Sequence, residues 1–131
     1  MSTLKVNTIQ DRVGGNQSTA SEIAQGRAKA WVEFSGQGSA SIIGSYNVSS
    51  VSRASNGNYQ VNFSSNFANT NYVVVCSSGA NINTYADGLN AQDNIALVLN
   101  KSAGNVKVAA TDIDAGENDD QDRISVVVFA W

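Results

Sequence analysis

The stretch YNVSSVSRASNGNYQVNF, residues 46–63, decides the fold class of this chain. Every second residue from Tyr59 to Phe63 is apolar and the residues between them are polar, which is the pattern of a strand with one buried face. The pair Asn56-Gly57 precedes this strand and is typical of a type I′ hairpin turn, because both central residues of that turn need positive φ. The stretch therefore predicts an antiparallel β-hairpin.

The first strand of this hairpin is not regular. Its apolar residues change from even to odd sequence positions between Val48 and Val51, so the alternation of a regular strand is interrupted there. This predicts a bulge or bend near Ser49 and Ser50. A second hairpin is expected further along the chain, where two apolar runs flank the turn Ser102–Asn105. The pattern outside the first quarter of the chain is thus that of short strands joined by tight turns.

The chain ends on RISVVVFAW, residues 123–131, whose apolar residues lie on both parities after Ser125. Such a strand is covered on both faces, one by an opposing sheet and the other by a second layer or a neighbouring subunit. A terminal aromatic such as Trp131 frays in water unless something docks it, so we expect it in a core or an interface. From residue 29 to residue 131 we predict an all-β body, an antiparallel sandwich of about seven strands.

Residues 1–28 are predicted to form an N-terminal arm with a linker and a short helix. Met1–Ile9 has the pattern of a lone strand, which must pair elsewhere in its own domain or with a neighbouring chain. A helix is expected from Thr19 to about Gln25, with Thr19 and Glu22 in a capping box and Gly26 in a left-handed C′ position. A helix this short is either a mere connector or is held by packing on the body or a partner. The candidate assembly residues are Leu4, Val6, Ile9, Ile23 and Trp131.

The composition excludes several functional classes. The 131 residues carry 8 Lys and Arg against 11 Asp and Glu, a formal net charge of −3, which does not favour nucleic acid as a partner. No apolar run reaches the roughly 20 residues of a membrane span, so a chain made in a host cytoplasm and without membrane insertion is expected. The absence of histidine removes Ser-His and Cys-His catalytic arrangements, and we expect neither an enzyme nor a cofactor.

The acidic stretch DIDAGENDDQD, residues 112–122, is where a metal site could form. It does not match an EF-hand loop, because Glu117 stands where the invariant glycine belongs and Arg123 where the bidentate glutamate belongs. Two interpretations remain open, a solvated loop tip and an irregular Ca²⁺ loop. The candidate ligands of such a loop are Asp112, Asp114, Asp119 and Asp120.

The segment Ala80–Asn94, ANINTYADGLNAQDN, has no strong strand character. A tyrosine among amide side chains on a rigid β scaffold has the composition of a carbohydrate or protein contact. The alternative is an ordinary loop with a packed tyrosine. The candidate receptor-contact residues are Asn81, Tyr85, Asp87 and Asn90.

Four stretches carry a resemblance to a known family: STLKVNTIQD, EIAQGRAKAWVEF, SYNVSSVSRASNGNYQVNFSSNFANTNYVVVCSS and RISVVVFAW. They resemble small virion structural proteins of tailed bacteriophages, in particular tail-fibre-like proteins of marine cyanobacterial phages. The resemblance covers most of the chain and leaves residues 80–94 poorly matched. It implies a non-enzymatic virion part that is usually homotrimeric.

A second, looser likeness concerns the fold. NYQVNFSSNFANTNYVVVCS, residues 58–77, resembles the strand, Phe-bearing turn and strand unit of H-type lectin sandwiches, although no sugar-binding residue of that family is matched. Two functions are therefore expected as alternatives. The first is a virion structural protein (a short fibre, tail appendage or head decoration) that forms a homotrimer and docks on other virion proteins through its arm. The second is a lectin-like module that binds a host-surface glycan or receptor.

Overall fold

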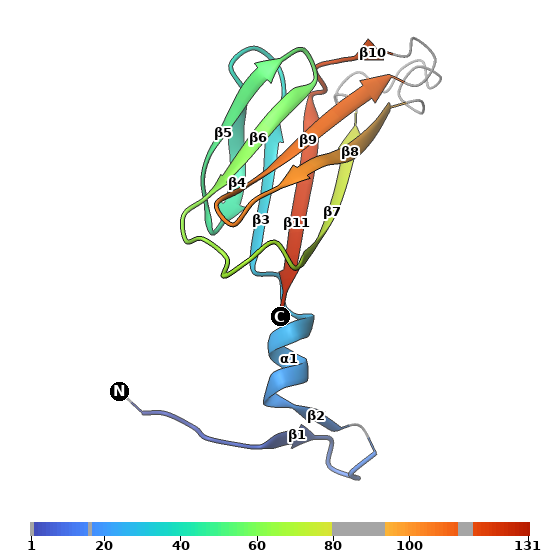
Figure 1. Cartoon of the computed structure of the whole chain (residues 1–131). Coiled ribbons are helices and arrows are strands. Elements are labelled where there is room, and N and C mark those ends of the chain that lie inside the picture. The colour runs from blue at the N-terminus through green and yellow to red at the C-terminus, as the bar shows by residue number, and fades with distance from the viewer. Residues whose placement is uncertain (1, 16, 80–93, 113–116) are drawn as a thin grey trace.

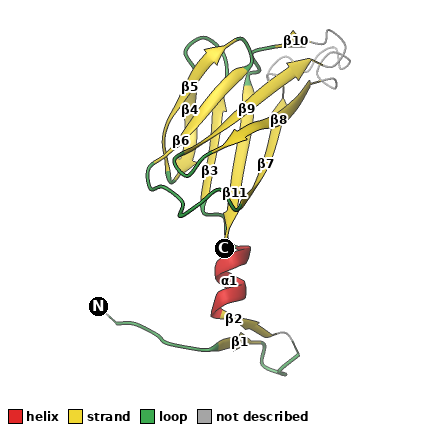
Figure 2. Cartoon of the chain, in the orientation of Figure 1, coloured by secondary structure: helices red, strands yellow, loops and turns green. Residues whose placement is uncertain are grey.

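The computed structural model describes residues 2–15, 17–79, 94–112 and 117–131. A β-sandwich body stands on one short helix, and a small two-stranded hairpin lies below the helix at the N-terminal end (Figure 1). The C-terminus lies at the top of the helix, so both chain ends are on the helix side of the body. In Figure 2 the body is made of strands and loops alone among the described residues.

Two antiparallel sheets form the body. The first has the strand order β4 (Ser41–Tyr46), β3 (Ala30–Ser35), β11 (Arg123–Ala130) and β7 (Tyr72–Gly79). The second contains β5 (Val48–Ser55), β6 (Asn58–Phe63), β9 (Asn105–Asp112), β8 (Asn94–Lys101) and the short β10 (Glu117–Asn118), which pairs with the end of β9. The predicted all-β antiparallel sandwich is confirmed, with nine strands in the described part of the body instead of about seven.

The core lies between the two sheets. Strands β3, β6 and β11 alternate strictly, with every second side chain buried and the others half-buried or exposed. The largest fully buried side chains are Tyr59, Tyr72, Phe34, Ile124, Val32, Val61, Val106, Val108, Val126 and Val128. Both sheets contribute to this cluster, and burial of its apolar surface is the main stabilising contribution to the body.

The predicted hairpin at Asn56-Gly57 is present between β5 and β6, but its turn is not type I′. Gly57 has φ 63°, whereas Asn56 is not among the described residues with positive φ. The pairing also shifts register between Arg53 and Ser55. The reason lies outside the hairpin, because Asn56 Nδ2 donates to the carbonyl of Asn118 at 2.7 Å and this contact fixes the turn against a distant segment.

Other local predictions are confirmed. The register of β5 shifts between Val48 and Ser50, where a bulge was expected. The second hairpin joins β8 to β9 through a turn in which Ser102 Oγ accepts a hydrogen bond from the Asn105 amide. The chain crosses from the first sheet to the second at Asn47, which has φ 53° and a side chain bonded to Lys29 O and the Ser65 amide.

The prediction that the N-terminal strand has no local partner is wrong. Within the described residues 2–15 the strand is β1 (Thr8–Gln10) alone, and it pairs with β2 (Gln17–Thr19) in a local antiparallel hairpin. Two residues reverse the direction of the chain between β1 and β2. The Asp11 carboxylate accepts hydrogen bonds from the backbone amides of Val13 and Gly15, and Gly14 has φ 74°. Asp11 and the glycines thus form a turn that strand periodicity does not reveal.

The helix α1 (Ala20–Gly26) begins as predicted. Thr19 accepts a hydrogen bond from the Glu22 amide and the Glu22 carboxylate accepts one from the Thr19 amide, which completes the capping box. The prediction of a left-handed Gly26 is wrong. Gly26 is the last helical residue, and Arg27 continues in extended conformation toward β3 without a left-handed residue.

Candidate functional site: an exposed arm, an apolar sheet face and a fastened acidic segment

The arm places apolar side chains in solvent. Leu4 is 85% exposed, and Val6, Ile9 and Val13 are exposed as well. These side chains belong to the extended residues 2–7 and to the β1–β2 hairpin, neither of which reaches the body (Figure 1). Four exposed aliphatic side chains within ten residues favour a segment that becomes buried against another molecule.

The helix α1 has the same property. It is seven residues long, none of its residues is buried, and Ile23 is 43% exposed. An isolated helix of this length is unstable in water even with a good cap, so its own chain supplies little of what would hold it. Ile23 is thus not buried within its own chain, and its packing on a partner stays a prediction.

Trp131 does not enter the core. Trp131 directly follows the last residue of β11 and is 73% exposed. It is the C-terminal residue, and the C-terminus lies at the end of the body nearest α1 (Figure 1). An open groove with a volume of about 460 Å³ lies beside it and is lined by Ala24, Phe67 and Ala130 among others. Trp131 is therefore not docked in the core of its own chain, and its docking in an interface with another chain stays a prediction.

A further apolar surface covers the outer side of the first sheet. Tyr46, Trp31, Val127 and Val75 are paired in register across all four strands, and Phe129 pairs with Val73 in the neighbouring row. On β3, β7 and β11 these positions alternate with more deeply buried ones, and Tyr46 pairs directly with Trp31, so these side chains point away from the core. We refer to the set Trp31, Tyr46, Val73, Val75, Val127 and Phe129 as the outer face.

Charge is scarce on the outer face. Glu33 and Arg123 also belong to this side of the sheet, and they pair with each other at 3.1 Å. Sequence reasoning indicated that β11 needs cover on its second face, but it did not identify Trp31 and Tyr46 as part of the same surface. That alignment depends on the register of three strand pairs, which no local pattern encodes.

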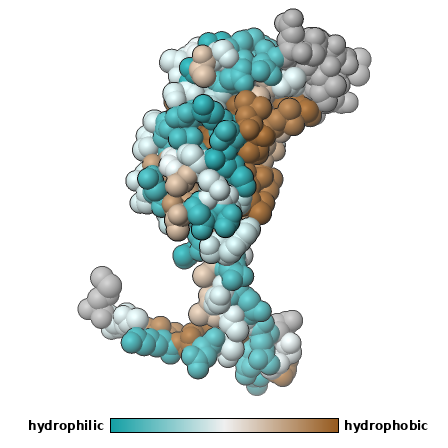
Figure 3. All heavy atoms as spheres, viewed as in Figure 1, coloured by the Kyte–Doolittle hydropathy of each residue, from teal (hydrophilic) through white to brown (hydrophobic). Residues whose placement is uncertain are grey.

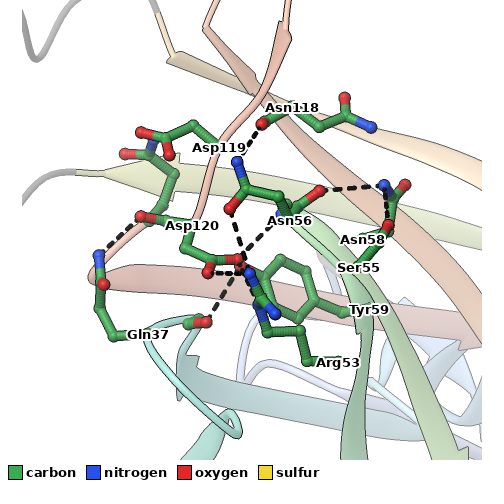
Figure 4. A network of polar contacts seen from close by, with 12 residues as sticks. Gln37, Arg53, Ser55, Asn56, Asn58, Tyr59, Asn118, Asp119 and Asp120 are labelled. Atoms are coloured by element: carbon green, nitrogen blue, oxygen red, sulfur yellow. Dashed lines mark hydrogen bonds and ion pairs between the residues drawn. The ribbon is translucent and has the colours of Figure 1, made fainter.

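In the acidic segment, residues 112–122, Asp120 forms hydrogen bonds and an ion pair with residues of the body (Figure 4). Its Oδ1 atom accepts hydrogen bonds from Arg53 Nε at 2.8 Å, the Tyr59 hydroxyl at 2.7 Å and the Gly57 amide at 2.9 Å. Its Oδ2 atom forms an ion pair with Arg53 at 2.6 Å. The backbone carbonyl of Asp120 also accepts a hydrogen bond from the Gln37 side chain.

These contacts change the acidity of the groups involved. The hydrogen bond from Arg53 is the main cause that lowers the pKa of Asp120 to about 2, with further contributions from Tyr59 and Gly57. Burial, and then the bond to Asp120, raise the pKa of the Tyr59 hydroxyl above its ordinary value. Asp120 is therefore a charged structural residue that ties β10 and the β5–β6 turn together.

Asp120 is one of the four candidate ligands of an irregular Ca²⁺ loop, and its carboxylate is bonded within the protein. Both carboxylate oxygens of Asp120 are already engaged by Arg53, Tyr59 and Gly57. Asp119 accepts a hydrogen bond from Gln121 at 3.4 Å. Within the described residues no group of three or more His, Cys, Asp or Glu side chains comes together. The Asp112 side chain and the whole of Asp114 lie outside the described part.

The candidate receptor-contact residues Asn81, Tyr85, Asp87 and Asn90 also lie outside the described residues. The Arg53–Asp120 pair, by contrast, is a feature that sequence reasoning missed. The two residues are 67 positions apart, and neither the hairpin pattern nor the acidic run indicates a partner for the other.

No protein-family model, curated protein or solved structure matches the chain. Among the described residues, no helix has the length and apolar character that crossing a membrane requires.

Proposed function

We propose that this chain is a non-enzymatic structural protein of a tailed-bacteriophage virion, which assembles as a homotrimer and docks on other virion proteins through residues 1–28. The observation that carries the proposal is the exposed apolar arm, in which Leu4, Val6, Ile9 and Val13 have no body to pack on. The sequence resemblance to tail-fibre-like virion proteins supports the same role. Location in the virion and attachment as a short fibre, tail appendage or head decoration belong to this proposal.

The distribution of surface chemistry supports attachment at the arm end. The apolar residues Ile23 and Trp131 lie on the helix side of the body, whereas the fastened acidic segment around Asp120 lies at the opposite end, near β10 (Figure 1). A protein anchored by one end is expected to bury there the apolar side chains that are exposed in the single chain.

The alternative is a module that binds a host-surface glycan or receptor. One observation favours it. The last residue of β7, Gly79, and the first residue of β8, Asn94, lie at the end of the body opposite α1 (Figure 1). The two functions use opposite ends of the molecule and can be separated by changing one end at a time.

Deletion of residues 1–26 is expected to abolish incorporation into particles while leaving the body folded. The core residues belong to β3 and later strands, and no residue of β1, β2 or α1 is buried. Circular dichroism and thermal melting of the truncated body, together with its presence in purified particles, measure the two effects. A shortened protein that is still incorporated, or one that no longer melts cooperatively, would overturn the assignment of attachment to the arm.

A matched control keeps the arm and changes only its apolar side chains. Leu4→Ser with Val6→Ser removes two exposed side chains and no described core contact. We expect the melting temperature of this variant to equal that of the wild type and its incorporation to fall at least about tenfold, which corresponds to about 1.4 kcal/mol of binding free energy.

A further inference from the structure

The outer face is large enough to be one side of a stable protein interface. Trp31 is 41% exposed and Tyr46 56%, and on the β7 edge Val73 and Val75 are 49% and 56% exposed. These fractions leave on the order of 400 Å² of apolar surface in solvent, within the roughly 300–600 Å² of the largest patch on a typical monomer, which is often functional. The exposed Trp131 extends this surface along the line of β11.

The apolar area of the whole face is close to the apolar share of one standard partner surface, which buries about 800 Å², somewhat more than half of it apolar. In a ring this area is divided between two neighbouring copies, and the exposed Ile23 and Trp131 add to the contacts. The charge on the face also fits another copy as the partner. Glu33 and Arg123 lie on the same side of the sheet as the outer face, and their charges neutralise each other. The outer face therefore does not select a partner of either charge. An uncharged apolar face complements another apolar face, and each further copy of the chain supplies one.

The layout of the face indicates how copies meet. Trp31 and Tyr46 lie on β3 and β4, on one side of β11, and Val73 and Val75 lie on β7, on the other side. In a cyclic assembly with β11 nearest the axis, the aromatic half of one copy faces the valine half of the next. Such head-to-tail contacts close into a ring without leaving an unpaired half.

We infer that copies of this chain associate through the outer face, with Trp31 and Tyr46 of one copy against Val73 and Val75 of the next and with Val127 and Phe129 nearest a threefold axis. This inference rests on the homotrimer of the proposed function and assigns its surface. The same arrangement gathers the α1 helices, which lie directly below the end of β11, so that Ile23 and Trp131 approach their counterparts (Figure 1).

A second apolar region gives the experiment its control. Hydrophobic side chains also gather over β8, where Leu97 is 44% and Leu99 55% exposed (Figure 3). The test variant, Tyr46→Lys with Val75→Lys, adds two positive charges to the outer face. The control variant, Leu97→Lys with Leu99→Lys, adds two positive charges to β8. The four replaced side chains are exposed to a similar degree. Light scattering of the full-length chain measures mass, and circular dichroism verifies folding.

We expect the wild type and the β8 variant to have three times the 13.7 kDa chain mass, and the outer-face variant to have the mass of one chain while keeping its β signal. A trimeric outer-face variant would overturn the assigned surface while leaving the homotrimer standing. Loss of mass in the β8 variant alone would assign the contact to β8. A monomeric wild type would overturn the homotrimer itself.

Cross-linking tests the pairing even if a charged variant fails to fold. Cys76 is the single cysteine of the chain and is replaced first, by Cys76→Ala. Tyr46→Cys with Val75→Cys then places two thiols on the outermost strands of a four-stranded sheet. Strands are about 4.8 Å apart, so these positions are roughly 14 Å apart within one chain, too far for a disulfide. Oxidation is expected to give a covalent trimer that dithiothreitol returns to single chains. Uncrosslinked chains after oxidation would contradict the proposed pairing.

Discussion

Replacement of Gly57 by alanine is expected to lower the free energy of unfolding by at least about 3 kcal/mol. Gly57 has φ 63°, and a Cβ atom there would lie 2.5 Å from the Ala110 carbonyl oxygen and 2.6 Å from the Asp119 amide nitrogen. Both neighbours are backbone atoms, so the β5–β6 turn must separate from β9 and from the acidic segment. The separation also breaks the bond from the Gly57 amide to Asp120.

Gly38→Ala is the matched control for this variant. Gly38 has the same φ of 63°, but a Cβ atom at this position would have no neighbour within 4 Å. The left-handed conformation alone costs about 1–2 kcal/mol for a residue with a side chain. Urea denaturation of both variants separates backbone strain from steric overlap. Equal destabilisation of the two would show that the contacts around Gly57 do not matter.

The second large effect is expected for Asp120→Asn, which should destabilise the body by about 2–4 kcal/mol at neutral pH. The variant removes the charge that Arg53 neutralises and offers one oxygen where the carboxylate offers two. Only 13% of the Asp120 side chain and 31% of the Arg53 side chain are exposed, so solvent replaces the lost interaction only in part. For a domain of this size the melting temperature should fall by roughly 10 °C.

The pH dependence of stability checks that the charge of Asp120 is responsible. Its pKa falls from 3.8 to about 2 in the folded protein, so its contribution is fully present above about pH 4 and is lost as the pH falls through 2. The wild type should therefore lose about 2 kcal/mol more than Asp120→Asn between pH 5 and pH 2. Parallel stability curves for the two proteins would contradict this role of the carboxylate.

The local elements of this fold follow from local chemistry. Alternation from Tyr59 to Phe63 predicts β6, the change of parity at Ser49 predicts the bulge, and Thr19 with Glu22 predicts the start of α1. Each depends on residues within one strand or one helical turn, where backbone periodicity relates sequence to geometry. The all-β class is therefore readable from the chain before any tertiary contact is known.

Tertiary contacts decide the features that sequence reasoning missed or misjudged. The bond from Asn56 to Asn118 fixes the β5–β6 turn in a form other than type I′, and Asp120 finds Arg53 across 67 residues. Asp11 closes a local hairpin where a lone strand was expected. In each case a polar side chain bonds to a group that periodicity does not place, so pattern alone does not determine the outcome.

Sequence also predicts some residues of the candidate site and not others. The exposed Leu4, Val6, Ile9, Ile23 and Trp131 were selected from sequence because their segments lack a core of their own. The outer face was indicated only through β11, since its width depends on the order β4-β3-β11-β7. Sequence thus predicts the ends of the proposed assembly surface, and the strand order supplies its proposed middle.

We propose that the arm fixes this protein to a virion and that three bodies meet through the outer face. A density map of the intact particle tests both parts of this proposal most directly. We predict three copies around one axis, with Val127 near that axis and with Leu4 and Val6 of each arm buried against another virion protein. A map in which the arms are free in solvent and the bodies stand apart, or in which the protein is absent, would contradict the account.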